Sequence, residues 1–135
     1  MKWPEAFTGT GRKEMSKFMI LFGASAMDHI PDEEMTAVAD AAHGVVQEIL
    51  NADAYVLAGG LKNCRASIVA TDGTITNGSE PEAIGGMTIV EVPSREEALV
   101  WAAKIATACR CAQEVWEFGH DPDLEEMLRQ TDGRS

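Results

Sequence analysis

The sequence has 135 residues, with 11 Lys and Arg against 22 Asp and Glu, so its net charge at pH 7 is −11. This length suits one domain, and a hydrophobic content of 45% is too high for a disordered chain. The negative charge excludes nucleic acid and anionic membrane surfaces as partners, because both would repel it.

The cysteines and a short apolar segment indicate the expected compartment of the protein and whether it binds a metal or cofactor. The sequence has three cysteines, Cys64, Cys109 and Cys111. An odd number of cysteines does not indicate a disulfide framework, so we expect a cytoplasmic protein. Cys109 and Cys111 lack the second ligand pair of a zinc site, and the glycine pairs do not form a phosphate loop. We therefore expect neither metal nor cofactor. The apolar run 18–23 is too short for a signal peptide core or a membrane span.

The first half of the chain predicts an arm, a strand and a helix. Residues 1–16 have no clean period and form an N-terminal arm, either loose or tied down by Trp3 and Phe7. Residues 17–24 are nearly all apolar and predict a buried strand. Residues 32–50 predict a helix with acidic residues at its start, and its apolar stripe consists of Met35, Val38, Ala39, Ala42, Val45, Val46 and Ile49.

The middle of the chain predicts several strands joined by tight turns. Residues 55–61 and 65–70 predict two strands, and Asp72-Gly73 is a hairpin turn signal before a short return at 74–76. Asn77-Gly78 is a second turn signal. Another strand at 87–92 follows the pair Gly85-Gly86.

The last third predicts a helix, a strand and a tail. Ser94 and Glu97 form a capping box for a helix that ends near Arg110, with a buried stripe of Ala98, Trp101, Ala102 and Ile105. Residues 112–118 predict the last strand. The tail, 119–135, contains a short helix over 121–130 whose apolar face consists of Leu124, Met127 and Leu128.

This order of elements predicts an α+β fold, a ferredoxin-like antiparallel sheet with two helices on one face. The strands at 17–24 and 55–61 are apolar on both faces, whereas two helices cover only one. The other face would be a large exposed apolar patch, which monomers rarely tolerate. We therefore expect a homodimer in which two sheets pack face to face.

Six segments carry a resemblance to a known family: KFMILFG at 17–23, DEEM at 32–35, VATDG at 69–73, GGMTIVEV at 85–92, EEALVWAA at 96–103 and EVWE at 114–117. Across residues 17–118 the chain resembles the YCII-related proteins, in particular the DGPF subgroup. The resemblance implies a dimeric α+β barrel and little about activity. The name-giving Asp-Gly-Pro-Phe is replaced here by Asn77-Gly78-Ser79-Glu80, so no carboxylate stands at its first position. Some YCII relatives carry a His–Asp acid/base pair without evident matching positions in this chain.

The candidate catalytic residues are His43, His29 and Asp28, because a histidine titrates near neutral pH and an adjacent carboxylate can orient it. His43 is expected at the edge of the helix's apolar stripe, where the helix flanks a cleft over the sheet. Each candidate also has a non-catalytic interpretation. His43 is then a half-buried helix residue, and Asp28 and His29 are a solvated pair in a loop. The candidate ligand-binding residues are Arg65, Asn77 and Asp72. Their alternatives are an ion pair for Arg65 and turn chemistry for the other two.

Three functions fit these observations. The first is a binding protein that holds a small organic ligand in a cleft between sheet and helices. The second is an enzyme of the isomerase, lyase or hydrolase type that uses a histidine base. The third is a protein–protein interaction module that docks through the helix of the tail.

Overall fold

The computed structural model describes residues 15–62, 66–78 and 83–132 of the chain. Arg65 and Cys64 therefore lie outside the described residues, as does the predicted arm except for its last two positions. The elements, in chain order, are β1 (Ser16–Gly23), η1 (Asp32–Glu34), α1 (Met35–Asn51), β2 (Tyr55–Gly60), β3 (Ser67–Val69), β4 (Ile75–Asn77), β5 (Ile84–Val92), α2 (Arg95–Cys109), β6 (Glu114–Glu117) and α3 (Pro122–Asp132).

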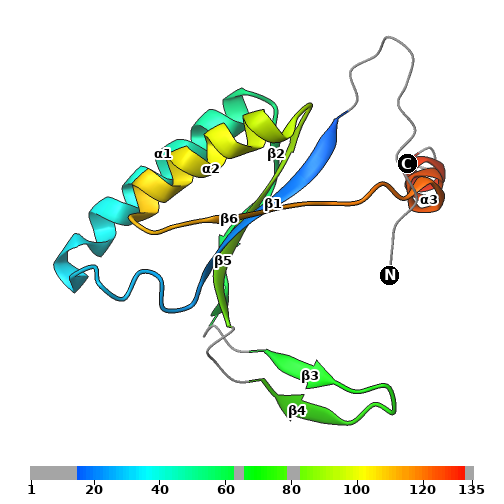
Figure 1. The fold of residues 1–135 in the computed structure, drawn as a ribbon, viewed down its shortest axis with the longest axis horizontal. Helices are drawn as coiled ribbons and strands as arrows, with labels where there is room; N and C mark the ends of the chain where they lie inside the picture. Colours follow the sequence, from blue (N-terminus) through cyan, green and yellow to red (C-terminus); the bar gives the residue numbers. More distant parts are fainter. Residues whose placement is uncertain (1–14, 63–65, 79–82, 133–135) are drawn as a thin grey trace.

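Four strands form an antiparallel sheet in the order β2-β5-β1-β6, and α1 and α2 lie side by side on one of its faces (Figure 1). The order β1-α1-β2-β5-α2-β6 along the chain is the ferredoxin-like arrangement, which confirms the predicted α+β fold. Strands β3 and β4 form a separate two-stranded hairpin inserted between β2 and β5.

The core lies between the sheet and the two helices. Alternate residues of the central strands point into it, and the largest fully buried side chains are Phe18, Ile20, Ile49 and Val90. Ala98, Ala102 and Ile105 of α2 pack against the same cluster, as the predicted stripe requires. Burying four side chains of this size contributes about 1.5–3 kcal/mol each to folding.

Local signals place the ends of α2. The Oγ of Ser94 accepts a hydrogen bond from the backbone N–H of Glu97 at 3.2 Å, which confirms the predicted cap. The helix ends where Arg110 adopts a left-handed conformation with φ of 59°, and the N–H of Cys111 then bonds to the carbonyl of Ala106. This reversal turns the chain back toward the sheet as β6.

The first helix begins later than the sequence predicts. Residues Asp32–Glu34 form a 3-10 turn, and the α-helix starts at Met35. Pro31 precedes the turn and no side chain caps it, so the first backbone N–H groups are arranged by the tighter i to i+3 pattern. None of the helices in the described ranges has both the length and the apolar character needed to cross a membrane.

The hairpin and α3 project from the body of the domain. Both extend to the side of the sheet that the helices leave uncovered, the hairpin at one end of the strands and α3 toward the other (Figure 1). The Oδ1 of Asp121 accepts a hydrogen bond from the N–H of Leu124 at 3.1 Å, so the tail helix begins where the Asp-Pro signal predicts it.

Candidate functional site

The uncovered face of the sheet is the largest apolar surface that the strands present. Directly paired residues share a face of a sheet, and Met19 pairs with both Ile89 and Trp116. Leu21 likewise pairs with Met87, and Leu57 pairs with Ile89. We call this surface the open face, and its residues are Lys17, Met19, Leu21, Leu57, Gly59, Met87, Ile89, Glu91, Glu114 and Trp116.

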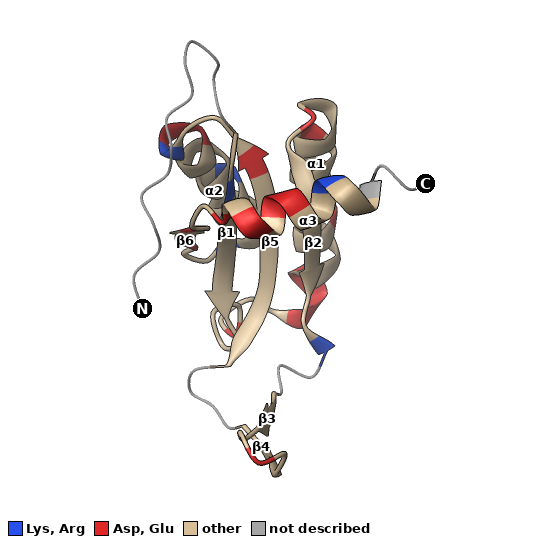
Figure 2. Cartoon of the chain, turned by 90° about the vertical axis from the view of Figure 1, so that its right-hand side faces the viewer, with Lys and Arg blue, Asp and Glu red and all other residues tan. Residues whose placement is uncertain are grey.

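Large apolar side chains of the open face remain in contact with solvent. Trp116 is 58% exposed and Leu57 is 52% exposed. Met19, Met87 and Ile89 are half-buried among their neighbours, and Leu21 is buried. Figure 2 views this face and shows strands β1, β5 and β2 free of charge along most of their length. An apolar surface of this kind is typical of an interaction or ligand-binding site.

The charged residues of the open face lie at its margins and pair locally. The Nζ of Lys17 lies 3.3 Å from the Oε2 of Glu91, its partner in register across β1 and β5. At the β6 edge, the indole N–H of Trp116 donates to the Oε1 of Glu114 at 3.0 Å. These pairs are solvent-exposed and leave the centre of the face apolar.

Gly59 presents no side chain on the open face, and we call the open space above it the hollow. Gly59 pairs with Met87, and a Cβ atom built on it would meet no atom within 4 Å. Gly86, on the opposite face, differs: a Cβ there would lie 2.9 Å from the ring of Phe22. Packing within the chain therefore accounts for a glycine at position 86 and does not account for one at position 59.

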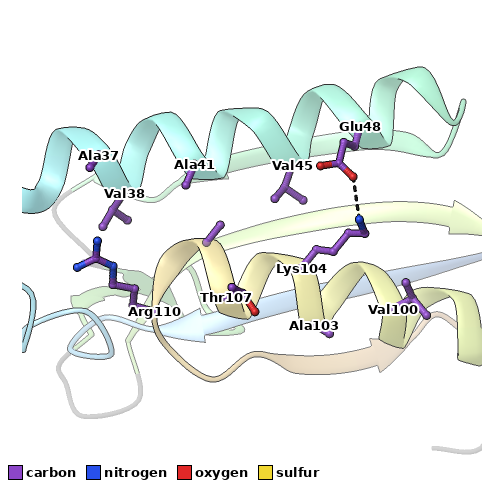
Figure 3. A pocket seen from close by; sticks show the side chains of 11 residues that line it. Ala37, Val38, Ala41, Val45, Glu48, Val100, Ala103, Lys104, Thr107 and Arg110 are labelled. Carbon is purple, nitrogen blue, oxygen red and sulfur yellow. Dashed lines mark hydrogen bonds and ion pairs between the residues drawn. The ribbon is translucent and has the colours of Figure 1, made fainter.

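A concave surface lies between α1 and α2, on the side away from the sheet (Figure 3). This groove has a volume of about 660 Å³ and is lined mainly by small side chains, among them Ala37, Ala41 and Ala103. Lys104 crosses it to Glu48 at 2.9 Å, and Arg110 pairs with Glu34 at its end. The groove therefore presents mainly small apolar side chains, and its charged residues are held in ion pairs.

The structure places His43 on the outer, exposed side of α1. The sequence prediction centred the apolar stripe near Met35, Ala42 and Val46. The buried residues of the helix are instead Val38, Val45 and Ile49. At 3.6 residues per turn, the true centre is rotated so that His43 lies roughly 140° away from it. His43 therefore faces solvent, away from both the core and the groove.

Asp28 and His29 lie together in the loop that joins β1 to η1, and both are exposed. The loop is a series of turns in which the N–H of Asp28 bonds to the carbonyl of Ser25 and that of Ile30 bonds to Met27. The buried side chain of Ile30 anchors it. His43 lies on α1, so the three catalytic candidates come from two separate segments, a loop and a helix.

Asp72 and Asn77 both belong to the hairpin. The Oδ1 of Asp72 accepts a hydrogen bond from the N–H of Thr74 at 2.9 Å, which lowers the pKa of this carboxyl below its ordinary value. Gly73 has a φ of 91°, so the turn role predicted for this pair is confirmed. Asn77 pairs with Ser67 as part of β4 rather than forming a turn.

The two described cysteines are free thiols at the end of α2. Burial raises the pKa of the Cys109 thiol, and the nearby Cys111 raises it further. Burial also raises the pKa of Cys111. Both are therefore weak nucleophiles at neutral pH. Within residues 15–62, 66–78 and 83–132, no three His, Cys, Asp or Glu side chains are arranged to hold a metal ion.

In comparisons with known proteins, no family model matches the chain, and no curated protein is significantly similar to it. The functional assignment therefore depends on the surfaces described above.

Sequence reasoning did not single out Trp116, Leu57 and Met87 as members of one surface. Alternation along each strand shows which residues share a side within that strand. The register between strands decides which of these sides combine, and register is a property of the folded sheet.

Proposed function

We propose that this protein is a homodimer that binds a small apolar organic ligand between two open faces. The observation that carries the proposal is the exposed apolar centre of the open face, with Trp116 and Leu57 in contact with solvent. This places the ligand on the opposite side of the sheet from the cleft expected between sheet and helices. That space holds the fully buried side chains of the core.

The open face supports dimerisation because water contact with a contiguous apolar patch is unfavourable. Two sheets that pack face to face stand about 10 Å apart and bury their facing side chains. Helices α1 and α2 lie on the other side of the sheet and leave this face uncovered (Figure 1). The resemblance to YCII-related proteins, which implies a dimeric α+β barrel, leads to the same proposal.

The hollow at Gly59 supports ligand binding inside such a dimer. Met87 lies beside it in register, and methionine side chains adapt to ligands of irregular shape. Lys17 and Glu91 neutralise each other at the margin, so the face favours an uncharged, apolar molecule over a carboxylate or phosphate.

The enzyme hypothesis has less support. Asp28 and His29 are adjacent but exposed, and His43 is exposed on the outer side of α1. A general base works within hydrogen-bond reach of a substrate held in a cleft. These residues line neither the groove between α1 and α2 nor the smaller pocket formed by Arg95 and residues 114–117. Enzymatic activity therefore remains a prediction for assay. The interaction-module hypothesis is favoured by one observation, the exposed apolar side chains of α3.

The expected compartment is the cytoplasm, a proposal that the free thiols Cys109 and Cys111 support.

The proposal is tested by native mass spectrometry and light scattering of the protein as purified. We expect a dimer with a retained organic molecule, and we expect Gly59→Leu to remove that molecule by filling the hollow. Gly44→Leu is the matched control, because Gly44 also has open space around its Cβ position but lies on α1. A monomer of 14.5 kDa would contradict dimerisation. Equal ligand retention in both variants would contradict the ligand site.

A further inference from the structure

Two appendages flank the open face. The β3–β4 hairpin projects from one end of the sheet, and α3 stands off toward the other end on the same side (Figure 1). In the view onto the open face, α3 crosses in front of the upper strands and the hairpin lies below them (Figure 2). The two views together place the hairpin and α3 on the same side of the sheet as the open face, toward opposite ends of its strands.

Each appendage carries apolar side chains that its own chain leaves exposed. On the hairpin, Val69 pairs with Ile75 across the two strands, and Ile75 is 66% exposed. An isolated two-stranded hairpin is marginally stable in water, so this one gains from packing on another surface. On α3, Leu124, Met127 and Leu128 form one stripe, with Met127 62% exposed.

A second copy on the open face would reach both appendages. Four strands about 4.8 Å apart and roughly six residues long give the face about 400 Å² in projection. A stable interface buries about 800 Å² on each partner, so the appendages supply area that the flat sheet lacks. The occupant that fits is a second copy of this chain, because its own open face and appendages present the same exposed apolar surfaces.

Two limiting orientations of the two-fold axis combine the appendages differently. In a face-to-face pair, the two-fold axis lies in the plane between the sheets. An axis along the strands places α3 against α3 and hairpin against hairpin. An axis across the strands exchanges the ends, so each α3 meets the hairpin of the other copy.

Charge distinguishes these two arrangements. Helix α3 carries Asp123, Glu125 and Glu126 against the single cation Arg129, so two adjacent α3 helices would repel each other. The hairpin is nearly neutral: between residues 66 and 78, all of which the structure describes, Asp72 is the only charged side chain.

We infer that, in the homodimer, the β3–β4 hairpin of each copy packs on the apolar stripe of α3 of the other copy. This inference rests on the proposed function, because it requires the dimer through the open face. The dimer is then closed at both ends by two identical contacts related by the two-fold axis.

The test is a charge-pair cycle in the full chain, using Met127→Lys, Ile75→Glu and the double variant, with dimer dissociation measured by light scattering on dilution. Each single variant places an unpaired charge in the contact, so we expect it to raise the dissociation constant about tenfold or more. In the double variant, each introduced glutamate meets an introduced lysine of the other copy, and we expect most of the affinity to return. Within one chain, the hairpin and α3 lie toward opposite ends of the open face (Figure 1). An ion pair between the introduced lysine and glutamate of the same chain therefore does not explain a recovery of dimer affinity.

Val100→Lys is the matched control, because Val100 is an exposed apolar residue of the groove between α1 and α2, away from the open face. We expect it to leave dissociation unchanged, and circular dichroism checks that all variants fold. A double variant weaker than both singles overturns the inference and indicates like-with-like packing. Wild-type affinity in both singles overturns it as well. Either result leaves the dimer standing, whereas a monomeric wild type overturns the proposed function itself.

Discussion

The two faces of the sheet are made by the same four strands, yet the chain treats them differently. On one face, Phe18, Ile20 and Val90 are fully buried beneath α1 and α2. On the other, Met19, Ile89 and Trp116 come from alternate positions of the strands, and neither α1 nor α2 covers them. The first face therefore holds the core of the monomer, whereas the second leaves apolar side chains in contact with solvent.

The largest difference is expected between Phe18→Ala and Trp116→Ala, which truncate an aromatic residue on each face. Phe18→Ala leaves a cavity in the core and should lower the free energy of unfolding by about 3–5 kcal/mol. Trp116→Ala should change it by less than about 1 kcal/mol at concentrations where the protein is monomeric. Urea denaturation at several protein concentrations measures both values. An equal decrease in the free energy of unfolding of both variants at every concentration would contradict the expected difference between the two faces.

The glycines give a second test of the same contrast. In Gly86→Ala the new methyl group meets the ring of Phe22 at 2.9 Å and the carbonyl oxygen of Gly59 at 3.2 Å. We expect a loss of about 1–3 kcal/mol, measured by thermal unfolding. In Gly59→Ala the methyl group meets nothing, and a strand prefers alanine to glycine by about 0.5–1 kcal/mol. A destabilised Gly59→Ala monomer would show that the hollow is needed for folding.

A smaller effect is expected for the ion pair at the margin of the open face. The side chains of Lys17 and Glu91 are both exposed in the single chain, so Lys17→Ala should change monomer stability by about 0–1 kcal/mol, and less at high salt. Denaturation at low and high ionic strength measures it. If a second copy covers this margin, the same variant should weaken the dimer more than it weakens the monomer.

The smallest effect is expected from Asp72 in the hairpin. Its pKa is lowered from 3.8 because the carboxylate accepts the N–H of Thr74. A lowered pKa in the folded state adds stability above the unfolded pKa, and this addition disappears as the pH falls through the folded value. NMR titration should therefore place Asp72 below an ordinary aspartate. In Asp72→Asn no carboxylate titrates at this turn. The contribution of the turn to stability should therefore stay constant as the pH falls through the folded pKa of Asp72. A pKa of Asp72 at or above 3.8 would contradict the hydrogen bond.

Local signals in the sequence predicted much of the fold. Ser94 and Glu97 marked the start of α2, Asp72-Gly73 marked the hairpin turn, and Asp121-Pro122 marked the tail helix. Each signal acts over a few residues, through a cap or a turn, so it is present before the chain packs. Strand ends were predicted less well: β5 begins at Ile84 rather than near Met87, because pairing with β1 extends it through the glycines.

The candidate site was harder to predict, and the reason differs between residues. His43 was expected at the edge of a cleft, but the tertiary packing of α1 on the sheet uses a stripe rotated away from the predicted one. The helix contains enough small apolar residues, such as Ala37, Ala39 and Ala41, for its pattern to suit more than one orientation. The strand that packs against it selects between these orientations.

The sequence by itself determined the α+β class, the order of the elements and the presence of an apolar surface that two helices leave uncovered. These properties depend on composition, periodicity and local capping, which act within single elements. The tertiary structure decided which residues make up the open face, where Gly59 leaves its hollow, and that the hairpin and α3 extend on the same side of the sheet. Register and packing between distant segments set those positions, and both arise only when the strands pair.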